Sequence, residues 1–233
     1  MRQRARAQTP HQEGRLSARP QARTGHATYA TGLQSLELGG KCDGLLYVPL
    51  GYSPDTPAAL VVLLHGAGGE AHGGINLLRP LADEANLVLL APESRASTWD
   101  VIRSDYGPDV AFIDRALAQT FDRYAIDPTH LAAGGFSDGA SYALSIGLTN
   151  GDLFTHILAF SPGFMAPTQL TDRPRIFISH GTRDAVLPIN MCSRRIMPQL
   201  QQAGYDIDYR EFEGPHTVPP DIARAAVSWF TQS

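Results

Sequence analysis

The sequence predicts an α/β fold, in which a mostly parallel, twisted sheet of about eight strands carries helices on both faces and no large lid domain. Three observations point to it. Strand-like and helix-like stretches alternate from Leu33 onward. The strands after residue 60 are almost wholly apolar, as strands covered on both faces are. The chain of 233 residues is 43% hydrophobic, which is enough for one sizeable core.

Eight segments have the composition of strands. They are 33–38, 45–48, 60–65, 87–91, 131–136, 156–161, 175–180 and 207–212. The first two have only glycine-rich turn residues between them, so we expect an antiparallel hairpin at one edge of the sheet. Helices are expected at 109–124, 138–149, 190–203 and 220–231. In the first of these, Val110, Ile113 and Leu117 follow each other at helical spacing and form one apolar face.

The beginning of the chain differs in composition from the rest. Residues 1–26 hold six arginines against one acidic residue, Glu13, and contain no apolar run that could serve as a secretory signal. Prolines and glycines interrupt any amphipathic helix here, which disfavours organelle targeting and leaves it open. We expect residues 1–31 to be a disordered, dispensable basic arm and residues 32–233 to form one α/β domain.

Charge and cysteine content exclude several classes of protein. The formal net charge is −4, and the acidic body argues against nucleic-acid binding, which needs clustered cations. Cys42 and Cys192 are too few for a disulfide framework, and free thiols favour a cytoplasmic location. The apolar runs are far shorter than the roughly 20 residues that cross a bilayer, so no membrane span is expected.

The motif G-x-S-x-G occurs at residues 135–139, between a strand-like and a helix-like segment. A sharp strand-to-helix turn exposes the serine Oγ, and a Cβ on either flanking glycine would clash. The helix start supplies free N–H groups and a positive dipole end for a developing anion. We therefore predict that Ser137 is a nucleophile; an inert serine in a glycine-rich connection is the alternative that this context disfavours.

A second glycine-rich segment, 65–69, has the sequence His-Gly-Ala-Gly-Gly and follows the strand at 60–65. Such a turn can leave backbone N–H groups free. An ordinary β–α loop or a phosphate-binding loop has a similar composition, but no G-K-[ST] follows to support the second. His65 and His72 lack a third ligand at a sensible spacing, so neither a metal nor another cofactor is expected.

Asp184 and His216 complete the predicted site. Asp184 lies just past the strand at 175–180, at the strand end where α/β sheets place functional groups, although on spacing alone it could be a solvated loop residue that pairs with Arg183. Of the eight histidines, only His216 follows Asp184. In the chain order Ser…Asp…His the base comes after the acid. The order therefore predicts a triad of Ser137, Asp184 and His216.

These four segments together resemble the α/β-hydrolase superfamily, over about residues 33–231. Within it, the sequences HGAGG, GGFSDGAS, SHGTRD and EGPHTVP are most similar to the phospholipase/carboxylesterase group, which includes acyl-protein thioesterases. The resemblance implies that the backbone N–H groups of Ala67 and Asp138 form an oxyanion hole. Asp138 stands where those enzymes often have glutamine, and the chain is also similar to poly(3-hydroxybutyrate) depolymerase-like esterases.

The triad and the resemblance predict a cofactor-free serine esterase that acts on short-chain or small soluble esters. Thioesters and polyhydroxyalkanoate oligomers stay open as substrates. A catalytically silent binding protein on the same fold also stays open, although such proteins usually lose a triad residue. Loops at the carboxyl edge of the sheet supply candidate pocket residues, each of which could instead serve in packing: His65, Trp99, Phe164, Leu187 and Val218.

Overall fold

The computed structural model describes residues 9–21, 29–40 and 42–232. In this part of the chain eight strands form one sheet, in the order β1-β2-β4-β3-β5-β6-β7-β8. The strands are β1 (Gly32–Ser35), β2 (Gly44–Val48), β3 (Ala58–Leu64), β4 (Leu87–Pro92), β5 (Ile126–Phe136), β6 (His156–Phe160), β7 (Arg175–Gly181) and β8 (Ile207–Phe212). β2 pairs antiparallel with β1 and β4, and all other pairs are parallel. The predicted fold class and the edge hairpin are confirmed.

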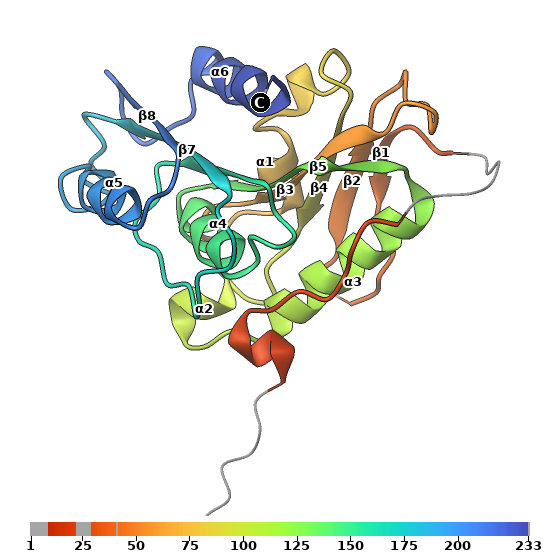
Figure 1. Cartoon of the computed structure of the whole chain (residues 1–233), viewed down its shortest axis with the longest axis horizontal. Helices are drawn as coiled ribbons and strands as arrows, with labels where there is room; N and C mark the ends of the chain where they lie inside the picture. The colour runs from red at the N-terminus through yellow and green to blue at the C-terminus, as the bar shows by residue number, and fades with distance from the viewer. Residues whose placement is uncertain (1–8, 22–28, 41, 233) are drawn as a thin grey trace, which may run out of the picture.

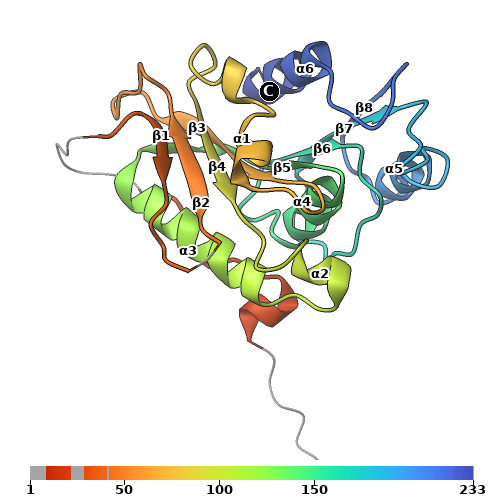
Figure 2. The same ribbon diagram turned by 180° about the vertical axis from the view of Figure 1, so that it is seen from behind.

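Helices cover both faces of this sheet (Figures 1 and 2). They are η1 (Pro10–Glu13), α1 (Ala71–Ile75), η2 (Arg79–Leu81), α2 (Asp100–Arg103), α3 (Pro108–Arg123), α4 (Asp138–Thr149), α5 (Ser193–Gln202) and α6 (Pro220–Thr231). α3, α4 and α5 pack on one face, and α1 and α6 pack on the other. The described residues contain no large additional domain, as expected.

β3 shows why the central strands are apolar at almost every position. Leu60 and Val62 contact the core beneath α3, whereas Val61 and Leu63 contact the core beneath α1 and α6. All four side chains are buried. Because successive residues of a strand point to opposite faces, a strand between two helical layers needs an apolar side chain at each position.

The parallel strands place the segments that the sequence singled out along one edge of the sheet. β3, β5, β7 and β8 run in the same direction, so their carboxyl ends meet at that edge. The turn at 65–69 follows β3, Ser137 follows β5, Asp184 follows β7 and His216 follows β8. Four segments that are far apart in the chain are therefore brought together.

The N-terminal segment 9–21 packs on the domain, which differs from the disorder expected for residues 1–31. Leu16 is 2% exposed and belongs to the core beneath α3. The side-chain amide of Asn150 accepts a hydrogen bond from the Leu16 N–H and donates one to the Gly14 carbonyl, both at 2.8 Å. In Figure 1 the segment runs beside α3.

An ion pair also holds this segment. Arg15 donates to both carboxylate oxygens of Asp152, at 2.9 and 2.8 Å. One leucine among arginines has no periodicity that a sequence pattern could detect, so its burial depends on the surface that the folded domain offers. Residues 1–8 and 22–28 of the expected arm lie outside the described residues.

Replacing Leu16 with alanine should therefore destabilise the protein. We expect the free energy of unfolding to fall by about 2 to 4 kcal/mol, because a buried leucine is replaced by a cavity. Chemical denaturation measures this change. Leu170→Ala is the matched control, since Leu170 is 57% exposed, and it should change the free energy little. Equal stabilities of the two variants would contradict the docking of this segment.

The buried His156 should make stability depend on pH. His156 begins β6 and packs against the rings of Trp229 and Phe230. Burial, with the charges of Arg175 and His130, lowers the pKa of His156 to about 4. Because this pKa lies below the unfolded value near 6.5, the stabilisation is complete above pH 6.5 and is lost as the pH falls toward 4.

We expect the free energy of unfolding of the His156→Leu variant to depend less on pH than that of the wild type. Between pH 7.5 and 5, the free energy of unfolding should fall by about 2 kcal/mol more in the wild type than in the variant. Urea titrations at the two pH values measure both losses. Losses of the same size would show that His156 titrates alike in the folded and unfolded chains.

Candidate active site

Ser137 lies in a sharp turn between β5 and α4. Its φ and ψ are 58° and −120°, a positive φ that residues other than glycine seldom adopt. A Cβ added to Gly139 would overlap the Leu64 carbonyl oxygen, and one added to Gly135 would lie 2.7 Å from the same oxygen. Both glycines are thus needed for α4 to begin so close to β3. The local structure is the strained strand-to-helix turn that G-x-S-x-G predicts.

His216 connects Ser137 and Asp184. Its Nε2 lies 2.8 Å from Ser137 Oγ, and its Nδ1 lies 2.5 Å from Asp184 Oδ2. The carboxylate can only accept, so Nδ1 carries the hydrogen and Nε2 is free to accept from the serine hydroxyl. The ring of Phe136 packs against the imidazole of His216, with the two ring centroids 4.5 Å apart. The three predicted residues therefore form one hydrogen-bonded chain.

The turns after β7 and β8 hold the acid and the base together. The Arg183 N–H donates to the Gly214 carbonyl at 3.0 Å, which ties the turn of Asp184 to the turn of His216. A Cβ on Gly181 would overlap the same carbonyl oxygen. A glycine at position 181 is what allows the two turns to approach each other this closely.

The Asp184 carboxylate is buried and fixed by donors on both oxygens. Oδ1 accepts from the backbone N–H groups of Val186 and Leu187 at 2.9 and 2.8 Å, while Oδ2 faces His216. Burial raises the pKa of Asp184, but the hydrogen bonds from Leu187, His216 and Val186 outweigh it and hold the pKa below its usual value. The acid is therefore ionised and oriented toward the imidazole.

The turn that follows β3 is shaped by its glycines. The Gly69 N–H donates to the Gly66 carbonyl at 3.0 Å, and Gly68 has a φ of 65°. A positive φ at the third position is what a type II turn requires, and glycine adopts it without strain. The Gly68 N–H donates to the Ser97 carbonyl at 2.7 Å, which ties the turn to the loop after β4.

Two backbone N–H groups near the nucleophile, those of Ala67 and Asp138, have no acceptor among the described residues. Asp138 is the first residue of α4, where helical N–H groups lack partners within the helix. A Cβ on Gly66 would lie 3.4 Å from Ser137 Cβ, so the turn of Ala67 lies beside the nucleophile. The side chain of Asp138 accepts from Thr98 Oγ1 at 2.7 Å, which holds the carboxylate at the loop after β4.

Two of the candidate pocket residues lie beneath this turn. Nδ1 of His65 donates to the Gly66 carbonyl at 2.8 Å and Nε2 accepts from the Ser94 N–H at 3.1 Å, while burial lowers the pKa of His65. Trp99 donates to the His65 carbonyl at 2.9 Å and stacks on Tyr142. Both side chains are almost fully buried. The pocket prediction is wrong for them: they support the turn from below.

The other candidates lie on segments with exposed surface. Phe164 and Leu187 are half-buried, and the methyl groups of Leu187 lie 3.4 Å from the point where a Gly163 Cβ would stand. Val218 lines a cavity of about 310 Å³ between the segment 73–81 and α6. The assignment of Phe164, Leu187 and Val218 to an acyl pocket stays a prediction, and Val218 is the one of the three that lines this cavity.

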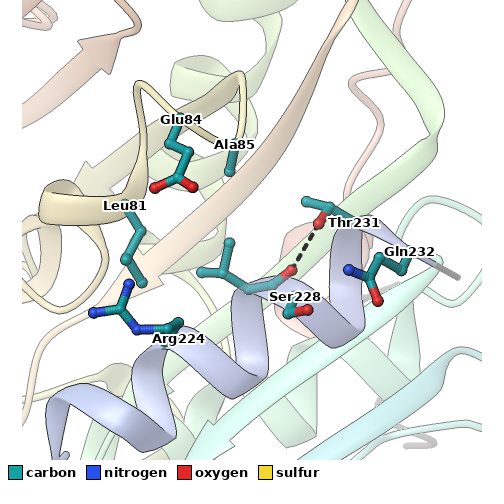
Figure 3. Close-up of a pocket in the computed structure, with 8 residues that line it drawn as sticks. Leu81, Glu84, Ala85, Arg224, Ser228, Thr231 and Gln232 are labelled. Atoms are coloured by element: carbon teal, nitrogen blue, oxygen red, sulfur yellow. Dashed lines mark hydrogen bonds between the residues drawn. The ribbon is translucent and has the colours of Figure 1, made fainter.

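A second cavity adjoins the first along α6. Its volume is about 320 Å³, and it shares Leu81 and Arg224 with the cavity of Val218. Figure 3 shows Leu81 and Glu84 on one side of it, and Arg224 and Ser228 of α6, with Gln232 just after that helix, on the other. Val218, two residues after His216 in the sequence, lines only the first of the two cavities.

A row of hydroxyl groups that the sequence analysis missed holds the segment 163–168. Ser141, Ser145 and Thr149 lie one turn apart on α4, and each accepts a backbone N–H from this segment, at 2.9, 2.9 and 3.2 Å. Each also donates to the carbonyl four residues earlier in α4. The spacing S-x3-S-x3-T was the available signal. These three hydroxyl groups fix the segment 163–168, which carries Phe164.

In the part of the chain that the structure describes, no group of three or more histidine, cysteine or acidic side chains could hold a metal ion. No helix among the same residues is long and apolar enough to cross a membrane.

Comparison with known proteins gives a family and several relatives that this chain resembles. A family model described as phospholipase/carboxylesterase matches residues 109–230, which is just over half of the chain. Feruloyl esterase C of Emericella nidulans is 27% identical over 154 residues, which cover 63% of this chain and 56% of the relative. The chain thus spans about half the length of this curated relative.

Solved structures share the fold at low sequence identity. Esterase PE8 superposes with a TM-score of 0.67 at 23% identity, covering 83% of this chain and 99% of that one. A phospholipase/carboxylesterase from Dyadobacter fermentans gives a TM-score of 0.59 at 20% identity, covering 88% and 98%. A ferulic acid esterase from Anaeromyces mucronatus, solved with ferulic acid, gives 0.61 at 18% identity, covering 94% and 97%. With the matched family model, the fold and the site geometry identify this chain as a member of the phospholipase/carboxylesterase family.

Proposed function

We propose that the protein is a serine hydrolase that cleaves carboxylic esters through an acyl-enzyme. The observation that carries the proposal is the position of His216, whose two ring nitrogens contact Ser137 Oγ at 2.8 Å and Asp184 Oδ2 at 2.5 Å. A nucleophile within hydrogen-bond reach of a base, with the base oriented by a third group, is the arrangement that activates a serine. Family membership supports the same activity.

The acylation step uses each member of the triad once. Ser137 Oγ bonds to the ester carbonyl carbon while its proton passes to His216 Nε2, and the carbonyl electron pair moves onto oxygen. Asp184 accepts the hydrogen bond from Nδ1 and stabilises the imidazolium. When the tetrahedral intermediate collapses, the alcohol oxygen leaves with the proton from Nε2. The acyl group then remains bound to Ser137.

Deacylation repeats the sequence with water. His216 Nε2 takes a proton from water as the water oxygen bonds to the acyl carbon. Collapse of the second tetrahedral intermediate returns the proton to Ser137 Oγ and releases the carboxylic acid. The ester and one water are consumed, and the three triad residues return to their starting protonation states.

We further propose that the N–H groups of Ala67 and Asp138 bind the oxyanion. Both lack an acceptor among the described residues, and they lie on either side of Ser137 in the turn after β3 and at the start of α4. Removing one such donor typically costs a serine hydrolase about 3 kcal/mol of transition-state stabilisation. His65 and Trp99 would then be positioning residues for the turn of Ala67, because they hold it from beneath.

For the acyl group, small soluble esters are our first candidate, and hydroxycinnamoyl esters are the second. The second candidate rests on the relatives named feruloyl esterase C, which align over 63% of this chain. Short p-nitrophenyl esters, methyl ferulate and an acyl thioester should be compared at equal concentration. A higher kcat/KM for methyl ferulate than for p-nitrophenyl butyrate would select the second candidate.

A catalytically silent binding protein is the rival proposal. Stopped-flow mixing of p-nitrophenyl acetate with wild type and with Ser137→Ala separates the two, because an acyl-enzyme that is hydrolysed slowly releases one equivalent of nitrophenol in a burst before steady turnover. Intact-mass measurement of the quenched protein should show one acetyl group, located on the Ser137 peptide. Wild type that releases nitrophenol no faster than Ser137→Ala, and that carries no adduct, would favour the silent protein.

A further inference from the structure

A second histidine, His180, lies behind the acid of the proposed triad. It stands near the end of β7, and its side chain has no exposed surface. Nδ1 lies 2.6 Å from Ser193 Oγ, the first residue of α5. Nε2 lies 2.8 Å from the Leu187 carbonyl oxygen and 3.2 Å from Asp184 Oδ2. The acid is therefore flanked by two imidazoles, of which the proposed mechanism uses one.

The partners of His180 determine where its proton lies. The Leu187 carbonyl can only accept, so Nε2 carries the hydrogen. The lone pair of Nδ1 then accepts the Ser193 hydroxyl hydrogen. Burial, with the charge of His216, lowers the pKa of His180, which favours this neutral form. The Leu187 carbonyl thus selects the tautomer that points an N–H at Leu187 and Asp184, and the Ser193 hydroxyl supports this tautomer by donating to Nδ1.

Leu187 links His180 to the carboxylate. The N–H of Leu187 donates to Asp184 Oδ1 at 2.8 Å, and its carbonyl accepts from His180. These two hydrogen bonds, from His180 to Leu187 and from Leu187 to Asp184, form a brace that connects His180 to the carboxylate. The same His180 N–H lies near Oδ2, where its positive end favours the ionised carboxylate. Without this brace, the turn 184–187 would depend on its own hydrogen bonds alone.

We propose that His180, oriented by Ser193, is a positioning residue that holds Asp184 through Leu187 so that the carboxylate faces His216. The inference rests on the proposed function, because it assigns the brace to the acid of that triad. A packing role alone would require only an apolar side chain of similar volume. His180 instead makes hydrogen bonds to Ser193 and to the Leu187 carbonyl in a fully buried place, and an apolar side chain could make neither of them.

Three substitutions test the brace. His180→Leu removes both hydrogen bonds and should lower kcat by about 10- to 100-fold with KM nearly unchanged, because the acid is misplaced and the substrate site is not. His180→Gln keeps an N–H donor near the place of Nε2 and should recover most of kcat. Ser193→Ala removes only the hydrogen bond to Nδ1 that orients the ring, so its loss of kcat should be smaller than that of His180→Leu.

A double-substitution cycle distinguishes positioning from general damage. In an Asp184→Asn background, His180→Leu should change kcat by less than about twofold, because the group through which it acts is already lost. The matched control is His156→Leu, which removes a buried imidazole at the opposite end of the sheet. It should lower the free energy of unfolding and leave kcat as it is.

A readout that needs no turnover keeps the inference separate from the proposed function. The hydrogen between His216 Nδ1 and Asp184 should give a proton NMR signal at very low field, absent in Asp184→Asn and shifted or broadened in folded His180→Leu. Wild type without ester turnover would refute the proposed function, and this signal would still test the brace. A folded His180→Leu with an unchanged signal and unchanged kcat, or an equal loss of kcat in both backgrounds, would overturn the inference.

Discussion

Ser137→Ala is expected to lower kcat/KM for small esters by about 10⁶-fold, since a triad enzyme that loses its nucleophile falls by this order. The methyl group cannot form the acyl-enzyme, and His216 has no hydroxyl proton to accept. The fold should be unaffected, because the serine backbone N–H still donates to the Phe160 carbonyl. Initial rates with p-nitrophenyl butyrate, and a thermal melt of both proteins, measure the two expectations.

A serine outside the site provides the control for this substitution. Ser228 lies on α6, on the wall of the second cavity, and Ser228→Ala should hydrolyse the same ester at close to the wild-type rate. If Ser137→Ala and wild type release nitrophenol equally fast, ester cleavage by Ser137 is refuted.

Asp184→Asn is expected to lower kcat by about 10⁴-fold, the loss measured when the acid of a serine-protease triad becomes an amide. The surroundings of Asp184 dictate how the amide must lie. Its oxygen has to accept the N–H groups of Val186 and Leu187, as Oδ1 does now. The NH₂ group then faces His216, whose Nδ1 must become an acceptor. The proton moves to Nε2, which can no longer accept the proton of Ser137.

The competing acids near the base supply controls for Asp184→Asn. Asp208 lies on β8 and pairs with Arg210 at 2.8 Å, and Asp206 pairs with Arg175 at 2.7 Å, so neither faces the imidazole. Asp208→Asn should keep a kcat close to that of the wild type. If Asp208→Asn lost activity while Asp184→Asn kept the kcat of the wild type, the acid of the triad would be on β8 and not after β7.

Support for the site comes from three separate parts of the fold. The turn after β3 stands on His65 and Trp99, α4 begins against β3 through Gly139, and the turn of the acid is tied to the turn of the base by Arg183. Each of these connections is made by buried side chains or by backbone groups that take no part in the proposed reaction. The geometry can therefore be kept while the substrate-facing side chains change.

Local sequence was enough for the sheet, for the long helices and for the position of each site segment. The reason is that periodicity, strand composition and turn glycines act within a few residues: Gly135 and Gly139 are required by a single turn, and β3 is apolar because both of its faces are covered. The order Ser137, Asp184, His216 anticipated the hydrogen-bonded chain that the structure contains, while the catalytic role of these residues stays a prediction.

The burial of Leu16, Trp99 and His180 could not be found in this way. Leu16 is one apolar residue in an arginine-rich segment, and it is buried because the folded domain offers a surface with Asn150 and Asp152 beside it. Trp99 was expected in a pocket, but the way the loop after β4 packs beneath the turn of β3 places it in the core. His180 and Ser193 are 13 residues apart, and only the packing of α5 against β7 brings them together. Contacts between distant segments depend on how whole elements pack, which no local pattern encodes.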